Sequence, residues 1–212
     1  MGNCCVGYEG WEGGDVEDAR RGQKLVGYQE VKCDVICGIK MNGKFARKAR
    51  LVAGGRTTDP PSSITDSSVV SRDGVRIAFM LAALNDLELS SCDIGNAYLN
   101  APCREKIWTV AGSEFGSEKG QVMIIVRALY GLKSSGASWR AMFAQSLTDM
   151  EFKPSKADPD VWIKPATKPD GTEYYEMILV YVDDVLAASH DVQAVMKAID
   201  NNYRLKEEAK VP

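Results

Sequence analysis

The chain has 212 residues, with 26 basic and 29 acidic side chains and a formal net charge of −3. A hydrophobic content of 45% is ordinary for a globular protein, so length and composition allow one large domain or two small lobes and identify no function. A net acidic charge argues weakly against a nucleic-acid binder, yet residues 38–58 carry six basic and no acidic side chains. The acidic start of the chain therefore masks a basic segment.

Six cysteines and one histidine lack the paired spacing of a zinc site, so we predict no zinc and reduced thiols. Neither a signal-peptide core nor an apolar stretch of membrane-spanning length is present in the sequence. We therefore expect a location inside the cell, in the cytoplasm or nucleus, and no membrane partner. The start Met1-Gly2-Asn3-Cys4-Cys5 hints at acylation, but Val6 stands where the motif needs Ser or Thr.

Residues 1–24 are acidic and rich in glycine, which predicts a flexible tail. From Leu25 a strand-like pattern leads to Asn42-Gly43, the strongest short signal for a β-hairpin. A loop rich in Thr, Pro and Ser follows at 57–68. Residues 71–87 then predict a helix, because apolar side chains recur at the helical period after a Ser71 or Asp73 cap; they are Val75, Phe79, Met80, Ala83, Leu84 and Leu87.

The second half of the chain predicts alternating strands and helices. Residues 87–92 predict a strand leading into Asp93, and a helix beginning near Ser135 has one apolar stripe, expected to face the core: Trp139, Met142, Phe143, Leu147 and Met150. Residues 161–164 and 174–179 are expected to pair antiparallel across the turn at 168–171, with Asp183 and Asp184 at the tip of the next hairpin. A last helical stripe spans 192–203. This order predicts an α+β fold.

The pair Asp183-Asp184 is flanked on both sides by strand-type apolar residues. Because burying unpaired charges is prohibitive, these carboxylates must be exposed at a turn or neutralised by cations. If neighbouring strands bring Asp93 opposite this turn, each pair of charges at about 5 Å costs roughly 3 kcal/mol at an effective dielectric near 20. Divalent cations would offset that cost. Oxygen-only ligands suit Mg²⁺, and two such ions roughly 4 Å apart can support phosphoryl transfer.

Several segments resemble, in order and spacing, the palm motifs of reverse transcriptases, in particular those of copia-type long-terminal-repeat retrotransposons. These segments are Asp93-Ile94-Gly95-Asn96-Ala97-Tyr98-Leu99-Asn100, Ala128-Leu129-Tyr130-Gly131-Leu132-Lys133 and Tyr181-Val182-Asp183-Asp184. Residues 48–53, 68–71 and 101–108 are similar too, and the resemblance covers roughly residues 28–205. It implies reverse-transcriptase-like fingers (25–70 and 101–130) and palm (71–100 and 131–209), with an antiparallel palm sheet backed by helices and the thumb missing.

The resemblance also implies the chemistry. Asp93, Asp183 and Asp184 would hold two Mg²⁺ ions, or Mn²⁺, and the partners would be an RNA or DNA template with primer and deoxynucleoside triphosphates. Tyr98 matches the position that screens the sugar 2′ position, the alternative being a core tyrosine. The remaining nucleotide-binding candidates are Lys48 and Arg50, which otherwise form a solvated basic face, and Tyr130, Gly131 and Lys133.

Departures from the family leave alternatives open. Ser134, Ser135 and Gly136 replace an amide or basic residue followed by Ala-Pro, and Gly95 replaces a frequent lysine. The family continues past the position of Pro212 into a primer-gripping hairpin, a thumb and an RNase H domain, so we expect a polyprotein fragment with weak or no activity alone. One alternative is a non-catalytic nucleic-acid-binding relic. Another, a phosphoacceptor receiver domain, is disfavoured because only 28 residues follow Asp184. The oligomeric state stays open.

Overall fold

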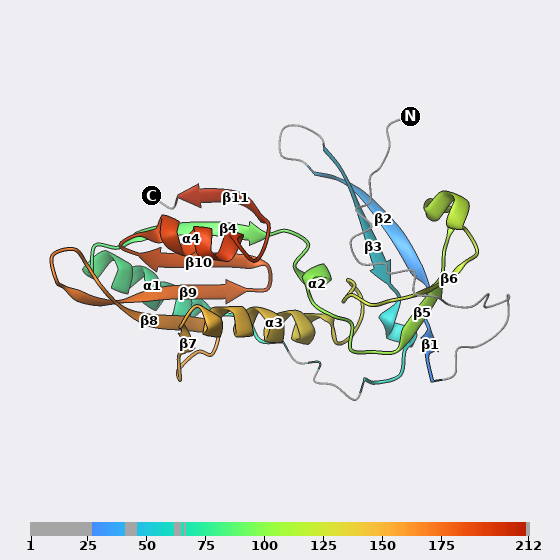
Figure 1. The fold of residues 1–212 in the computed structure, drawn as a ribbon, viewed down its shortest axis with the longest axis horizontal. Helices are drawn as coiled ribbons and strands as arrows, with labels where there is room; N and C mark the ends of the chain where they lie inside the picture. Colours follow the sequence, from blue (N-terminus) through green and yellow to red (C-terminus); the bar gives the residue numbers. More distant parts are fainter. Residues whose placement is uncertain (1–26, 41–45, 62–64, 66, 211–212) are drawn as a thin grey trace. The chain divides into compact units, whose positions relative to one another are not determined.

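The computed structural model describes residues 27–40, 46–61, 65 and 67–210. The predicted tail at 1–24 and the Asn42-Gly43 turn lie outside these residues. The described part has mixed α and β structure, as expected, and the chain divides into two compact units (Figure 1). Unit 1 comprises Met1–Asp66 and Tyr98–Trp139, and unit 2 comprises Ser67–Ala97 and Arg140–Pro212.

Unit 1 contains a hairpin and a small sheet. The hairpin strands β2 (Cys33–Lys40) and β3 (Ala46–Ala53) pair antiparallel over their whole length, which confirms the predicted hairpin. In the sheet, β5 (Ile107–Val110) lies between β1 (Gln29–Glu30) and β6 (Val122–Ile124), parallel to the former and antiparallel to the latter. The unit also contains two short 3₁₀ helices, η1 (Gly55–Thr57) and η2 (Ser113–Glu118). One buried cluster forms its core: Val31, Ala53, Ile107, Ile125, Leu129 and Leu132.

Unit 2 is built on a six-stranded antiparallel sheet in the order β11-β4-β10-β9-β8-β7 (Figure 1). Its strands are β4 (Glu88–Ile94), β7 (Lys153–Pro154), β8 (Val161–Thr167), β9 (Glu173–Tyr181), β10 (Asp184–Ser189) and β11 (Leu205–Lys210). The predicted hairpin turn at 168–171 is confirmed, because Lys168 O accepts from Gly171 N at 2.9 Å and β8 pairs with β9. The strand expected to lead into Asp93 is β4.

Helix α1 (Arg72–Leu84) packs on one face of this sheet. Ser71 caps it by accepting a hydrogen bond from Gly74 N at 2.9 Å, as predicted, and the helix ends three residues before the expected Leu87. Its buried side chains are Ala78 and Ala82, which join Met177, Leu179 and Ala188 of the sheet in one cluster. Small side chains thus face the sheet, whereas four members of the predicted apolar stripe are exposed: Phe79, Met80, Ala83 and Leu84.

The other face of the sheet carries α4 (Val192–Asp200) and the C-terminal part of α3 (Ser135–Asp149) (Figure 1). Trp139, Phe143 and Leu147 of the predicted α3 stripe are buried, and the Phe143 ring meets the Tyr203 ring edge-on at 5.5 Å. A single helical turn, α2 (Ala97–Asn100), follows β4. Among the described helices, none combines the length and apolar character that crossing a membrane requires.

A buried ion pair, not predicted from the sequence, ties together three segments of unit 2. Asp160 is only 2% exposed, and its Oδ1 lies 2.9 Å from Nε of Arg140, the first residue of α3 that belongs to unit 2. Its Oδ2 accepts a hydrogen bond from Ser68 Oγ, and its backbone carbonyl accepts from Val180 N on β9 at 3.0 Å. The pair therefore anchors the strand that ends in the Tyr181–Asp184 turn.

Candidate functional site

The Asp183-Asp184 pair lies where predicted, at the tip of the β9–β10 hairpin. Tyr181 pairs with Asp184, so Val182 and Asp183 form a two-residue turn. Val182 has a φ of 58°, in the left-handed region that a β-branched residue rarely adopts, and a hairpin turn with positive φ at its first position normally has glycine there. Such strain costs on the order of 1–3 kcal/mol and is found mainly at functional sites. The turn is thus held in place by the strands around it.

Strand β4 brings Asp93 to the same end of the sheet. In the β4–β10 register Asp93 is the partner of Asp184, and Ile94 N donates a hydrogen bond of 2.7 Å to the carbonyl of Asp183. Asp93, although far from this pair in the sequence, therefore lies beside Asp183 and Asp184 at one end of unit 2. These three residues are called the acidic edge below. This juxtaposition is the one that the sequence pattern predicts.

The negative charges of Asp93, Asp183 and Asp184 lie close enough together to affect one another. Burial, followed by the charges of Asp183 and Asp93, raises the pKa of the Asp184 carboxyl above its usual value. Asp93 Oδ1 is buried and accepts no hydrogen bond from the described residues, and it forms an ion pair with Lys206, whose Nζ lies 3.6 Å away. A positive charge at this edge would stabilise all three carboxylates.

The acids offer only oxygen ligands, which fits Mg²⁺ or Mn²⁺ in donor chemistry. In the part of the chain that the structure describes, however, no group of three or more His, Cys, Asp or Glu side chains is arranged to hold a metal ion. To share an ion, the side chains of Asp93, Asp183 and Asp184 would therefore have to turn toward a common point.

A pocket of about 390 Å³ adjoins Asp184 on the α1 face of unit 2. Apolar side chains supply most of its lining, and Arg72 at the start of α1 and Tyr181, which is 53% exposed, contribute polar groups. Sequence reasoning missed this pocket and Arg72. The sequence placed Arg72 directly after the Ser71 cap and so in the first turn of α1. Only the structure shows that this turn shares a pocket with Asp184.

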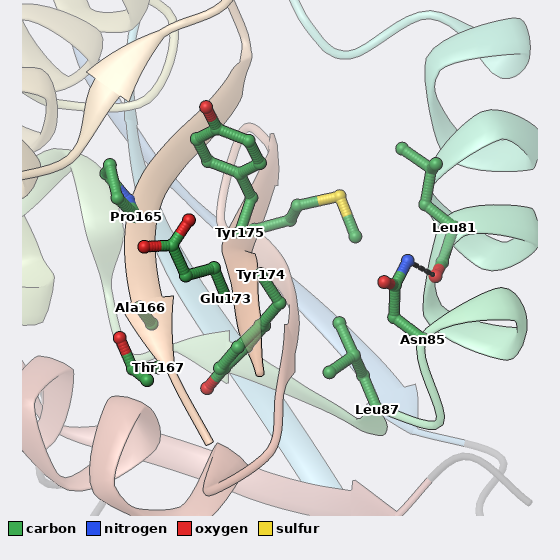
Figure 2. A pocket seen from close by; sticks show the side chains of 10 residues that line it. Leu81, Asn85, Leu87, Pro165, Ala166, Thr167, Glu173, Tyr174 and Tyr175 are labelled. Carbon is green, nitrogen blue, oxygen red and sulfur yellow. Dashed lines mark hydrogen bonds between the residues drawn. The ribbon is translucent and has the colours of Figure 1, made fainter. Parts of the chain in front are cut away.

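A second pocket in unit 2, of about 450 Å³, lies between the end of α1 and the β8–β9 hairpin (Figure 2). Leu81, Asn85 and Leu87 line one side, and Glu173 and Tyr175 are among the residues on the other side. Since Glu173 begins β9 and Tyr181 ends it, this pocket is at the far end of the strand from the acids. It does not belong to the acidic edge.

Three of the predicted nucleotide-binding residues form a contiguous group in unit 1. The rings of Tyr98 and Tyr130 lie 4.6 Å apart between centroids, at 36° to each other, and Arg50 Cζ lies 5.6 Å from the centre of the Tyr130 ring. The second contact is within cation–π range. Lys48, two residues before Arg50 and so on the same face of β3, is exposed.

Gly131 and Lys133 are held against the end of β3. Gly131 has a φ of 95°, and a Cβ atom there would lie 2.0 Å from the carbonyl oxygen of Ala53, so only glycine fits. Ala53 N donates a hydrogen bond of 2.8 Å to Tyr130 O, and Lys133 Nζ donates one of 2.6 Å to Thr58 O. These contacts fix the segment that precedes α3.

The serines that depart from the family pattern have structural roles. Ser134 donates from both its backbone N and its Oγ to the Glu105 carboxylate, and Ser135 Oγ donates to Leu129 O at 2.6 Å. A carboxylate is favourable at a helix N-terminus, and here the Glu105 side chain accepts the hydrogen bond of the Ser134 backbone N–H just before α3 begins. Sequence reasoning did not identify this contact, because the two residues are 29 positions apart.

Comparison with known proteins finds a family whose match includes Asp93, Asp183 and Asp184. The family model for reverse transcriptase (RNA-dependent DNA polymerase) matches residues 21–211, nearly the whole chain. The chain belongs to the reverse transcriptase family. Membership in this family of nucleotidyltransferases rules out the alternative of a phosphoacceptor receiver domain. The antiparallel pairing of β9 with β10 contradicts that alternative as well, because receiver domains are built on parallel sheets.

The curated relatives confirm the resemblance to copia-type retrotransposons. The chain is 29% identical over 178 residues to the retrovirus-related Pol polyprotein from transposon TNT 1-94 of Nicotiana tabacum. It is 26% identical over 158 residues to the corresponding polyprotein from transposon RE1 of Arabidopsis thaliana. These matches cover 81% and 73% of the chain but 13% and 10% of the two relatives. This reverse transcriptase sequence thus corresponds to a small part of such a polyprotein.

Proposed function

We propose that the chain carries the polymerase chemistry of a retrotransposon Pol polyprotein, the addition of deoxynucleotides to a primer 3′ hydroxyl directed by an RNA or DNA template. The observation that carries this proposal is the pairing of Asp93 with Asp184, beside Asp183 on a strained turn, in a chain of the reverse transcriptase family. Acids crowded at one sheet edge are suited to bind cations and have no evident structural use.

In this proposal unit 2 is the palm and unit 1 the fingers. The division of the chain near residues 66, 97 and 139 supports most of the assignment of 25–70 and 101–130 to the fingers and of 71–100 and 131–209 to the palm. The exceptions are residues 67–70, which fall in unit 2, and residues 98–100 and 131–139, which fall in unit 1. The antiparallel sheet of unit 2, covered by helices on both faces, has the layered construction expected of a palm.

Asp93, Asp183 and Asp184 would hold two Mg²⁺ ions, or Mn²⁺ in their place. When bound, such ions activate the attacking 3′ hydroxyl and stabilise the charge on the leaving pyrophosphate. The protein's own contribution is to hold the carboxylates in place. The two-residue turn and the hydrogen bond from Ile94 N fix the Asp183 backbone, and strand pairing fixes Asp93 opposite Asp184.

The group of Arg50, Tyr130 and Tyr98 would bind the incoming deoxynucleoside triphosphate, with Lys48, Gly131 and Lys133 beside it. Tyr98 would exclude a 2′ hydroxyl by its ring, which the Tyr130 ring supports from 4.6 Å away. Arg50 and Lys48 would attract the triphosphate. Replacing Tyr98 by Val should therefore relax discrimination against ribonucleotides by about ten- to a hundredfold, measured as the ratio of kcat/KM for the two sugars.

Primer extension tests the proposal most directly. The chain would be joined to the segment that follows the matched region in the tobacco relative and assayed with Mg²⁺, alongside Asp183→Asn and, as a matched control, Asp170→Asn in the exposed β8–β9 turn. We expect extension by the parent and the Asp170 variant, and a loss of at least a hundredfold for Asp183→Asn. Full activity of Asp183→Asn would refute the metal assignment. Template binding without extension in the parent would favour the non-catalytic relic.

A further inference from the structure

Lys206 on strand β11 lies next to the acidic edge. In the β11–β4 register Lys206 is the partner of Asp93, and its Nζ lies 3.6 Å from Asp93 Oδ1. That oxygen is buried and accepts no hydrogen bond from the described residues, although the Asp93 side chain as a whole is 44% exposed. The ammonium therefore faces Asp93 from the edge strand of the sheet, at a distance that allows electrostatic attraction but is too long for a hydrogen bond.

Gly95 gives the Lys206 side chain the space to reach this position. Its backbone N donates a hydrogen bond of 2.8 Å to Arg204 O, which joins β11 to the end of β4. A Cβ atom on residue 95 would lie 2.9 Å from that carbonyl oxygen and 3.2 Å from Lys206 Cε. Any residue other than glycine would therefore have to displace the lysine stem or the strand that carries it.

We infer that Lys206 is a built-in counter-ion of the acidic edge, positioned by Gly95, and that a divalent cation must displace its ammonium from Asp93 in order to bind. This inference rests on the proposed function, since it assumes that the acids bind metal. Three carboxylates with no cation nearby repel one another, and a lysine on a flexible stem relieves that repulsion while the metal is absent. Because both partners are about half exposed, the pair is weak enough to be opened.

Metal affinity, measured without any turnover, tests the inference. Mn²⁺ would be titrated into the 212-residue chain and free Mn²⁺ followed by electron paramagnetic resonance, for the parent, Lys206→Gln and Lys206→Arg. Removing one positive charge a few ångströms from a divalent ion should tighten binding by about tenfold in a solvent-exposed setting. Lys206→Arg, which keeps the charge, should stay within about threefold of the parent. Equal or weaker binding by Lys206→Gln would overturn the inference.

Asp183→Asn separates this inference from the proposed function. If the parent and Lys206→Gln bind Mn²⁺ equally and Asp183→Asn does not bind it, the acids hold metal as proposed and only the counter-ion role is wrong. If neither the parent nor Lys206→Gln binds Mn²⁺, the metal site and the inference are both overturned.

The positioning role of Gly95 has its own test. Gly95→Ala should tighten Mn²⁺ binding in the same direction as Lys206→Gln, because it moves the ammonium away from Asp93. Added to Lys206→Gln it should change the affinity no further, since no ammonium remains to be moved. Additive effects of the two changes would refute the positioning role. Far-UV circular dichroism checks that each variant is folded, and the comparison of Lys206→Gln with Lys206→Arg decides the counter-ion role even if Gly95→Ala fails to fold.

Discussion

Truncation of Asp160 to alanine should destabilise unit 2 strongly. The change removes the partner of the Arg140 guanidinium and the acceptor of the Ser68 hydroxyl, and leaves a partly buried cation without its carboxylate. Breaking a buried ion pair from one side typically costs about 3–5 kcal/mol. Because Arg140 keeps 33% of its side-chain surface exposed and can recover some hydration, the lower end applies, about 3 kcal/mol. The hydrogen bond from Val180 N to the backbone carbonyl of residue 160 does not involve the truncated side chain.

Urea unfolding at pH 7, followed by circular dichroism, measures this loss as a shift of the midpoint at constant slope. The matched control is Asp73→Ala, which breaks an ion pair of 3.6 Å with Arg76 in which the two side chains are 85% and 71% exposed. We expect the control to change the free energy of unfolding by less than about 0.5 kcal/mol. A loss below about 1 kcal/mol for Asp160→Ala, or one equal to that of the control, would show that the buried pair does not anchor β9.

Gly131→Ala forces an alanine into positive φ against a backbone carbonyl and should lower the free energy of unfolding, measured in urea, by about 2–3 kcal/mol. The control Gly38→Ala, with open space around its Cβ, should change that free energy by less than about 1 kcal/mol. Equal effects of the two changes would contradict the packing argument. Burial alone would raise the pKa of Asp158, but hydrogen bonds from Ser71 and from the Asp160 backbone N together outweigh it and lower that pKa. The carboxylate therefore stabilises the folded state above the unfolded pKa near 3.8 and loses this effect as the pH falls through the lower folded value. The stability gap between the parent and Asp158→Asn should therefore close in acid, and a gap independent of pH would show that the Ser71 hydrogen bonds do not favour the charged carboxylate. Leu84→Gln should leave the urea midpoint nearly unchanged, within about 0.5 kcal/mol, since Leu84 is 74% exposed; a large loss would place this side chain in a core.

The sequence determined the local elements and the family. The Asn42-Gly43 and 168–171 turn signals predicted two hairpins whose strands the structure contains, and the Ser71 cap predicted the start of α1. These features depend on neighbouring residues only, so they can be predicted without the rest of the chain. The resemblance of the segments around Asp93, Tyr130-Gly131 and Tyr181–Asp184 to the palm motifs of reverse transcriptases predicted the family, which the family match confirms.

Tertiary structure alone decided which faces are buried and which charges meet. The helical period of α1 could not show that Ala78 and Ala82, and not Phe79 or Leu84, face the sheet, because close packing against a sheet favours small side chains. Asp160 gave no signal in the sequence, since its partner Arg140 is 20 residues away.

The same limit applies to the acidic edge. The sequence predicted that Asp183 and Asp184 lie at a hairpin tip, because a turn is where adjacent charges between apolar strands stay solvated. That Asp93 pairs with Asp184, and that Lys206 reaches Asp93 past Gly95, depends on strand order and register, which are set by long-range pairing. The residues proposed to carry the chemistry could be identified in the sequence, but the charge that balances them was visible only in the folded chain.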